Sequence, residues 1–561
     1  MVNKIKGSTV IAEILHKEKV PFITAFPGGG PNSPVAQIVN ESHRKGVRTI
    51  LPRTERGVVN IVDGYARVSG KVGVCALYEG PGVENAYSGV AQAYSDGSRV
   101  LILAGQARRS AMAYDSPNND VDGVNLFSNC TKWVKRANVV QDIPYLMRRA
   151  YTKLRNGKPG PVYLELVFDI VTEELDESAF DYLKVEQWRT QGDPRDVEKA
   201  VKILLGAKNP LIYAGEGVFY ADASKELAEF ADLMQIPVMT TLKGKGLFSE
   251  SNELSVGSGG ATGISDLQHY FTEADLVLGI GVSFTRGPGV RMQNKTKYIQ
   301  VVINEDDVNK QAPISQVVFG DAKLVLKQLI QEVRKQTNGA GRKRDDSLIR
   351  EIEKQKAGWL QRWKPLLTSN EVPINPYRLI WDMVNTFDLE NTIITHDAGW
   401  PRAQIAPFWK TTVPRGYFGW GHHSTLGFSV AAMIGAKLAA PEKTCVSFTG
   451  DGAFGEGGIE LETAVRYGIP ILVIIPNNIG LGHYSMDTPS LNVLGGDYAK
   501  IAEGMGAYSE RVETPDEIIP ALKRAMKVLE SNQPALLDVI CKREWANQNS
   551  GVDAKPPKLQ A

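Results

Sequence analysis

The sequence predicts an α/β protein with three doubly wound parallel-sheet domains. Short β-branched runs alternate with longer segments of helical periodicity, which is typical of parallel sheets covered by helices on both faces. Two polar stretches of poor apolar periodicity, residues 175–195 and 336–346, separate three blocks of this kind. The length of 561 residues also exceeds what one hydrophobic core supports, at about 150 residues per domain.

The first block, residues 1–175, contains four expected strands, several of which end directly in glycine-rich turns. These strands are Phe22–Ala25, Val72–Ala76, Val100–Ala104 and Val162–Leu166. In parallel sheets the ligand-binding loops follow the carboxyl ends of the strands. We therefore expect ligand loops after these strands.

The second and third blocks, residues 190–335 and 370–545, repeat this alternation. In the second block, strands are expected near residues 211–217, 236–242, 274–281 and 298–304, and the small or polar turns after them are typical of a Rossmann-like fold. Whether this block binds FAD or ADP is left open by the glycine turns. The third block has expected strands at Thr392–Thr395, Cys445–Phe448, Ile471–Ile475 and Ala535–Ile540. The tail, 546–561, has little apolar content and is expected to be mobile or to serve as a lid.

Composition favours a small-molecule partner. Lys and Arg number 64 against 63 Asp and Glu, so the net charge of +1 provides no field to gather nucleic acid or an anionic membrane. The chain has neither a run of about 20 apolar residues nor a secretory signal pattern, and a cytoplasmic location is expected. The four cysteines form no CxxC pair and are expected to be small core residues.

The most informative segment runs from Thr449 to Asn478. A strand delivers Asp451 into a glycine turn, a helix follows, and a second apolar strand delivers Asn477 and Asn478. Mg²⁺ prefers hard oxygen ligands and commonly takes only a few from protein, while phosphate oxygens and water complete its shell. Asp451 and Asn478 suit such a site, although an ordinary turn and a helix cap are the alternative.

This segment resembles the GDG…NN motif of thiamine-diphosphate-dependent enzymes, specifically the acetolactate synthase and benzoylformate decarboxylase superfamily. The separation of 27 residues (478 − 451) is the one this family uses. The resemblance implies thiamine diphosphate and Mg²⁺ as cofactors and a pyrimidine-binding, a central and a diphosphate-binding domain in that order. The implied metal ligands are Asp451, Asn478 and the carbonyl of Gly480, and the implied coenzyme-binding residues nearby are Gly450, Gly452 and Ala453.

Residues 51–70 resemble the family segment that carries the catalytic acid, which places that acid at Glu55. In the family this carboxyl group hydrogen-bonds the aminopyrimidine ring, and the ring nitrogen then removes the proton from the reactive carbon. The alternative is a favourable acid at a helix N-terminus. By the same resemblance Gly28 and Gly29 would approach the coenzyme or substrate and Gln106 would face the reaction centre, with a structural turn or cap as the alternative for each. Glu79 departs from the serine usual in the family.

The segment from Trp420 resembles the family helix that grips the pyrimidine. It implies that the Ser424 carbonyl faces the exocyclic amine and that Leu426 supports the bent coenzyme, and Gly399 is assigned to the same site. His422 and His423 are unlike the small residues common in acetolactate synthases and are candidates for substrate contact. His483, after the metal loop, is a further candidate beside the coenzyme; ordinary surface or core histidines are the alternative.

The resemblance implies a decarboxylating carboligase, in which a 2-oxo acid loses CO₂ and the remaining acyl unit joins a second carbonyl. Phe284-Thr-Arg-Gly and Leu481-Gly-His-Tyr depart from the acetolactate synthase pattern. A 2-hydroxyacyl-CoA lyase or oxalyl-CoA decarboxylase is one rival function, because the segment around Glu460 resembles that branch of the family. In such an enzyme Arg108 and Arg109 could contact the phosphates of CoA. A catalytically silent nucleotide- or flavin-binding member is another. The coenzyme is expected between the first block of one subunit and the third of its partner, which requires a homodimer at minimum; a homotetramer is also open.

Overall fold

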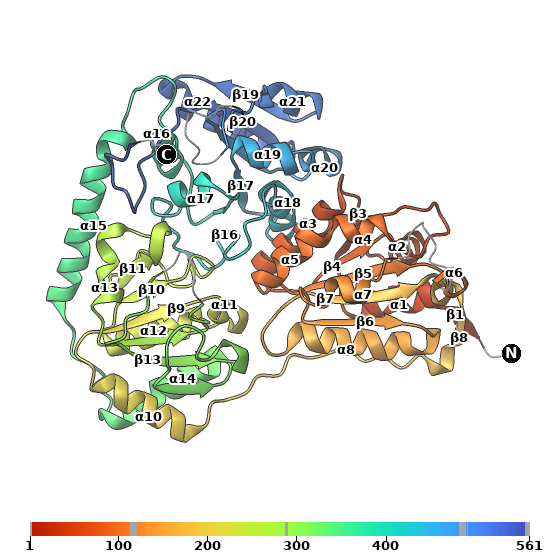
Figure 1. The fold of residues 1–561 in the computed structure, drawn as a ribbon, viewed down its shortest axis with the longest axis horizontal. Helices are drawn as coiled ribbons and strands as arrows, with labels where there is room; N and C mark the ends of the chain where they lie inside the picture. The colour runs from red at the N-terminus through yellow and green to blue at the C-terminus, as the bar shows by residue number, and fades with distance from the viewer. Residues whose placement is uncertain (1–2, 113–120, 286–289, 482–489, 491, 556–561) are drawn as a thin grey trace.

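The computed structural model describes residues 3–112, 121–285, 290–481, 490 and 492–555. Three six-stranded parallel sheets, each flanked by helices, make up three domains (Figure 1). This confirms the predicted α/β class with three parallel-sheet domains. A short antiparallel pair, β1 (Lys4–Lys6) and β8 (Glu174–Asp176), ties the start of the chain to the end of the first domain.

The first sheet has the strand order β3-β2-β4-β5-β7-β6. Its strands are β2 Phe22–Phe26, β3 Arg48–Ile50, β4 Gly73–Leu77, β5 Val100–Gln106, β6 Trp133–Ala137 and β7 Val162–Val167. The principal helices are α1 Gly7–Lys17, α2 Pro34–Arg44, α3 Glu55–Ser69, α5 Tyr87–Ser95 and α8 Ile143–Arg155. Helix α3 begins where the Thr54 hydroxyl accepts from the Gly57 amide at 2.9 Å, and it ends at Gly70, whose φ of 70° is left-handed.

The central sheet has the order β11-β10-β9-β12-β13-β14. Its strands are β9 Pro210–Ala214, β10 Val238–Thr240, β11 Ser255–Ser258, β12 Leu276–Ile280, β13 Lys297–Val302 and β14 Gln316–Phe319. Helices α10 Pro194–Leu205, α12 Ser224–Met234 and α14 Ala322–Gln336 pack around it. The order reverses at β9, so β9, β10 and β12 end at the crevice where ligands bind in such sheets.

The third sheet has the order β16-β15-β17-β18-β20-β19. Its strands are β15 Thr392–His396, β16 Tyr417–Gly419, β17 Thr444–Phe448, β18 Leu472–Asn477, β19 Tyr508–Val512 and β20 Ala535–Ile540. The helices are α16 Pro376–Thr386, α17 Trp400–Ile405, α18 Ser429–Ala439, α19 Asp451–Gly457, α20 Glu460–Tyr467, α21 Tyr498–Gly504 and α22 Ile518–Leu529. Strands β15, β17 and β18 are neighbours, and their carboxyl ends carry the segments singled out in the sequence.

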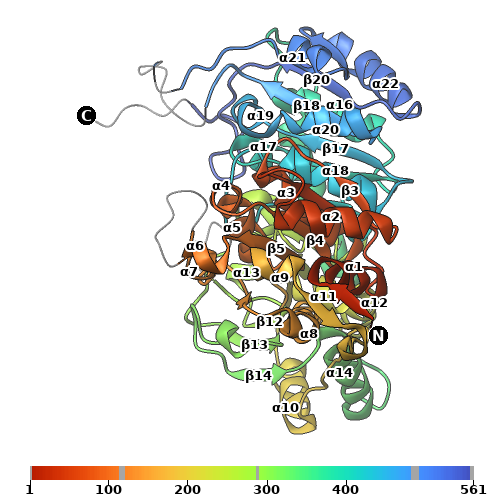
Figure 2. The ribbon, with the colours of Figure 1, turned by 90° about the vertical axis from the view of Figure 1, so that its right-hand side faces the viewer.

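Helices α3 and α18 join the first domain to the third (Figures 1 and 2). A Cβ at Gly64 would lie 1.9 Å from the Ala432 carbonyl oxygen, and one at Gly435 would lie 1.8 Å from that of Ile61. The two backbones therefore touch at positions where only glycine fits. This contact sets the position of the start of α3 relative to the third domain.

A long helix, α15 (Asp346–Leu367), follows the second polar stretch and was not predicted. Its Trp359 and Trp363 pack on Phe408, with ring centroids 4.9 and 5.3 Å apart, so the helix belongs to the core of the third domain. The first residues of the predicted tail are packed as well: the Ala546 carbonyl accepts from the Tyr377 hydroxyl at 2.6 Å. Of this tail, residues 556–561 lie outside the described part of the chain.

All four cysteines are buried and free, as expected. In the described parts of the chain, no helix combines the length and the apolar character that crossing a bilayer requires.

Candidate functional site

Asp451 lies at the carboxyl end of β17, as the first residue of α19. Its Oδ2 accepts from the Gly480 amide at 2.9 Å and its Oδ1 from the Gly452 amide at 2.8 Å. The side chain is buried, and burial raises the pKa of this carboxyl group despite the two amides. A bound cation would offset that cost of burying the negative charge.

Asn478 directly follows β18, the neighbour of β17, so its side chain and Asp451 come from adjacent strand ends. Its Oδ1 is buried without a hydrogen-bond partner. Buried amide oxygens in native structures nearly always have a partner, so this oxygen is available to a metal ion. Gly480 lies two residues on, with its amide bound to Asp451.

These residues line a cavity of about 460 Å³ in the third domain. Pockets that enclose cofactor-sized molecules measure roughly 300–1,000 Å³. Nine of the residues assigned to the site from the sequence line it, namely Gly399, Ser424, Leu426, Gly450, Asp451, Gly452, Ala453, Asn478 and Gly480. A Cβ at Gly452 would lie 2.8 Å from Leu481 Cδ1, so a side chain there would fill this part of the cavity. The donor set and the space fit Mg²⁺ with thiamine diphosphate.

Asp397, which was not predicted, organises the loop that carries Ser424 and Leu426. It follows β15 and is fully buried. Its Oδ1 accepts from the amides of Ala398 (2.7 Å) and Gly427 (3.0 Å). Its Oδ2 accepts from the amide (2.8 Å) and hydroxyl (2.7 Å) of Ser429. Burial raises the pKa of this carboxyl group, while the four donors oppose the shift.

Glu55 lies at the first position of α3, where Asn85 Nδ2 donates to its Oε2 at 3.3 Å. A Cβ at Gly82 would lie 3.7 Å from Glu55 Cγ, so the start of the short helix α4 (Pro81–Asn85), which follows β4, lies beside the Glu55 side chain. Gly28 and Gly29, after β2, adjoin the Tyr78 ring, and a Cβ at either would lie within 2.8 Å of it. The first sheet thus brings these predicted residues to one edge.

Gln106 and Glu79 lie at the same edge. Gln106 Nε2 donates to the Val121 carbonyl at 2.8 Å, which fixes the side chain. Glu79 is 7% exposed, its Oε2 has no hydrogen-bond partner, and burial raises the pKa of its carboxyl group. A Cβ at Gly105 would lie 2.7 Å from Glu79 Oε2, so the carboxyl group packs on the end of β5.

The start of α3 is bound to the third domain of the same chain by Glu460. Glu460 Oε1 accepts from the Thr54 amide at 3.0 Å and the Thr54 hydroxyl at 2.8 Å, and Oε2 accepts from the Arg53 amide at 3.0 Å. Glu55 nevertheless does not line the cavity that contains Asp451: its lining residues all lie between 376 and 542. Within one chain, Glu55 and Asp451 therefore do not line the same cavity.

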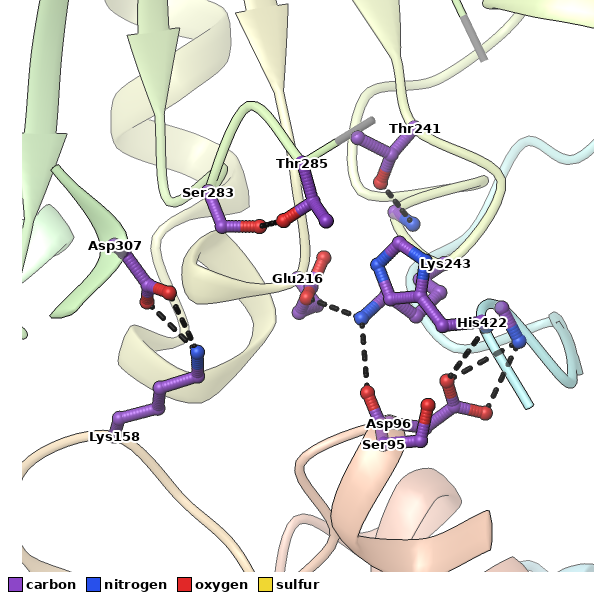
Figure 3. Close-up of polar contacts among 12 residues, drawn as sticks. Ser95, Asp96, Lys158, Glu216, Thr241, Lys243, Ser283, Thr285, Asp307 and His422 are labelled. Atoms are coloured by element: carbon purple, nitrogen blue, oxygen red, sulfur yellow. Dashed lines mark hydrogen bonds and ion pairs between the residues drawn. The ribbon is translucent and has the colours of Figure 1, made fainter. Parts of the chain in front are cut away.

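His422 lies on the side of the central domain. Its amide donates to Asp96 Oδ1 at 3.4 Å, and the neighbouring Gly421 amide donates to Asp96 Oδ2 at 3.1 Å (Figure 3). His422 lines a cavity of about 100 Å³ with residues of the central domain, among them Lys243, and partial desolvation by these neighbours lowers the pKa of its ring. Both His422 and His423 are nevertheless exposed, and His483 lies outside the described residues.

Two ion pairs lie at the crevice of the central sheet. Lys243 lies 2.6 Å from Glu216, and Lys158 lies 2.8 Å from Asp307 (Figure 3). The two cavities beside these pairs measure about 100 and 60 Å³. Pockets that enclose molecules of nucleotide size are several-fold larger. Bound FAD or ADP, which the sequence leaves open, would require these side chains to move.

Comparisons with known proteins agree with this architecture. Three family models match: the N-terminal TPP binding domain of thiamine pyrophosphate enzymes over residues 5–126, the central domain over 197–329, and the C-terminal TPP binding domain over 397–539. A probable acetolactate synthase large subunit of Methanococcus aeolicus is 32% identical over 560 residues, 95% of this chain and 92% of the relative.

Two further relatives cover similar shares. A probable acetolactate synthase large subunit of Methanocaldococcus jannaschii is 32% identical over 565 residues, 96% of this chain and 92% of the relative. The acetolactate synthase large subunit of Haemophilus influenzae is 29% identical over 560 residues, 96% of this chain and 95% of the relative. The chain therefore belongs to the thiamine pyrophosphate enzymes and is homologous to acetolactate synthase large subunits over its full length.

Proposed function

We propose that this thiamine-diphosphate-dependent enzyme is a decarboxylating carboligase of 2-oxo acids, as acetolactate synthases are. The proposal is supported by homology to acetolactate synthase large subunits, together with the buried Asp451 carboxylate and the unpartnered Asn478 oxygen, which line one cofactor-sized cavity. The catalytically silent alternative is disfavoured because Glu55, Asp451 and Asn478 are all present.

In this proposal the third domain holds the cofactors. Asp451, Asn478 and the Gly480 carbonyl would bind Mg²⁺, and the Gly450–Ala453 backbone would lie against the diphosphate. When bound, thiamine diphosphate supplies a nucleophilic carbon for addition to a carbonyl group. The Ser424 carbonyl would accept from the aminopyrimidine, and Leu426 would support the ring from below. Asp397 keeps the loop of both residues in position.

Glu55 would donate a hydrogen bond to the pyrimidine ring and so promote removal of the proton from the reactive carbon. The cavity contains no first-domain residue of its own chain. We therefore propose that Glu55 reaches it from the partner subunit, together with Gln106 and the Gly28–Gly29 loop, in at least a homodimer. A tetramer built from two such dimers satisfies the same requirement.

Contacts of the described residues weigh against the CoA-dependent rival. Glu460 is occupied by the Arg53 and Thr54 amides, which is a structural role. Arg109 pairs with Glu173, and the Arg108 guanidinium stacks 4.0 Å from the Phe168 ring centroid. Arg108 and Arg109 would have to give up these contacts with Phe168 and Glu173 before they could bind the phosphates of CoA.

The test is a mass-spectrometric product screen of the protein loaded with Mg²⁺ and thiamine diphosphate. Pyruvate, benzoylformate, oxalyl-CoA and a 2-hydroxyacyl-CoA are supplied separately, with an Asp451→Asn variant as the control for cofactor-independent products. Acetolactate from pyruvate, absent in the variant, would support the proposal. Formyl-CoA from a CoA substrate, without any product from 2-oxo acids, would reject it in favour of the rival.

A further inference from the structure

Arg402 lies at the boundary of two cavities. It is the third residue of α17 and lines both the 460 Å³ cavity of Asp451 and the 100 Å³ cavity of His422. Asp451, Asn478 and Gly480 line only the larger cavity. The guanidinium group therefore lies where the proposed cofactor site meets the central domain.

Arg402 lacks a counter-ion among the described residues. Its Nε is buried without a hydrogen-bond partner, and no carboxylate of the described chain forms an ion pair with the guanidinium group. The other cations of the two cavities are paired: Lys542 lies 2.9 Å from Glu371, and Lys243 lies 2.6 Å from Glu216. A half-buried, unpaired guanidinium group is costly unless a ligand supplies the anion.

The Trp420 ring holds this cation in place. The Arg402 guanidinium carbon lies 4.2 Å from the ring centroid, a geometry in which the ring face attracts the cation. Trp420 also lines the larger cavity. The cation is thus positioned beside the cavity before any ligand arrives, which lowers the entropy lost on binding an anion.

We propose that Arg402 binds the carboxylate of the 2-oxo acid that accepts the acyl group. This inference rests on the proposed carboligase function. A planar guanidinium group matches a carboxylate through two parallel hydrogen bonds. Its place at the boundary of the two cavities, with the metal ligands only in the larger one, favours a substrate carboxylate over the cofactor diphosphate.

The chemistry of the two substrates favours the acceptor over the donor. In the donor, the bond between the carboxylate and carbonyl carbons breaks, CO₂ leaves, and the electron pair stays on the former carbonyl carbon. That carbon then bonds to the carbonyl carbon of the acceptor, whose oxygen takes a proton. The acceptor carboxylate keeps its charge throughout, whereas a cation bound to the donor carboxylate would stabilise the state before CO₂ loss and slow that step.

The kinetic test compares Arg402→Gln and Arg402→Lys with wild type, all loaded with Mg²⁺ and thiamine diphosphate. Pyruvate is the donor, and pyruvate and acetaldehyde compete as acceptors; acetolactate and acetoin are quantified by mass spectrometry. Because acetaldehyde has no carboxylate, the acetolactate to acetoin ratio should fall about 10- to 100-fold in Arg402→Gln and partly recover in Arg402→Lys. CO₂ release in the first turnover, measured by rapid quench with limiting pyruvate, isolates the donor step and should change far less than the product ratio, because the acceptor binds only after CO₂ has left.

A binding measurement separates this inference from the proposed function. Oxamate, an unreactive analogue of pyruvate, is titrated calorimetrically into the loaded proteins, with Arg195→Gln on the exposed side of α10 as the matched control. Binding about 10- to 100-fold weaker in Arg402→Gln alone would support the carboxylate site. Unchanged oxamate affinity and product ratio would overturn it, as would loss of thiamine diphosphate binding, which would assign the guanidinium group to the diphosphate. If wild type released no CO₂ from any 2-oxo acid, the proposed function would fall, and the oxamate titration would still decide whether Arg402 binds carboxylates.

Discussion

Replacing Asp397 with Asn should loosen the loop that carries Ser424 and Leu426. Oδ1 accepts from two backbone amides, whereas Oδ2 accepts from the Ser429 amide and the Ser429 hydroxyl. The amide nitrogen of Asn would therefore replace Oδ2, where the hydroxyl can turn to accept from it and only the Ser429 amide loses its acceptor. A hydrogen bond to a charged group contributes about 1.5–3 kcal/mol, so this one lost bond corresponds to about 1.5–3 kcal/mol before relaxation. Relaxation of the loop toward solvent would recover part of this local cost.

Hydrogen exchange followed by mass spectrometry measures this effect locally, which suits a chain of three domains that need not unfold in one step. Amides of residues 427–429 should exchange about 10- to 100-fold faster in Asp397→Asn, and thiamine diphosphate should bind more weakly by calorimetry. Asp345→Asn is the matched control, because that exposed carboxylate also accepts from two backbone amides, at the start of α15. Unchanged exchange at 427–429, with unchanged coenzyme affinity, would refute the role assigned to Asp397.

Three further outcomes are expected. Glu55→Gln should slow exchange of the reactive coenzyme proton at least about 10²-fold, followed by NMR, while coenzyme affinity holds; wild-type exchange would reject the role. Asp451→Asn should abolish Mg²⁺-dependent coenzyme retention on gel filtration, and retention equal to wild type would count against the metal site. Burial raises the pKa of Glu79, so its stabilising contribution is present at low pH and is lost as pH rises through the folded-state pKa. Glu79→Gln should therefore make the unfolding midpoint less pH-dependent between pH 4 and 8 in calorimetric scans, and identical slopes would contradict this.

The features predicted best from the sequence depend on neighbours along the chain. Asp451 and Asn478 end two strands that a helix connects, and such strands pair side by side in a parallel sheet. The strand–helix–strand sequence therefore predicts that both side chains line one cavity. Local sequence also predicts the place of Glu55 at the start of α3, which follows from the Thr54 cap. Helix α15 was missed because it lies beyond the second polar stretch, between two of the predicted blocks.

The sequence around a residue does not predict contacts with distant segments, as three residues show: Asp397, Glu460 and Arg402. Asp397 gains its role from donors 30 and 32 residues away, and Glu460 from donors more than 400 residues away. Arg402 stands out only because the described residues around it supply no counter-ion. Each property depends on which distant groups approach in the folded chain.

Taken by itself, the sequence predicted the three parallel-sheet domains, because strand, glycine turn and helix are contiguous and their geometry is local, and its family resemblance supplied the coenzyme and the candidate metal ligands. Only the tertiary structure showed that Glu55 does not line the Asp451 cavity of its own chain, that ion pairs lie at the central crevice, and that no described carboxylate pairs with Arg402. The physical reason is that burial, exclusion of water and pairing of charges arise from long-range packing, to which segments far apart in the sequence contribute together.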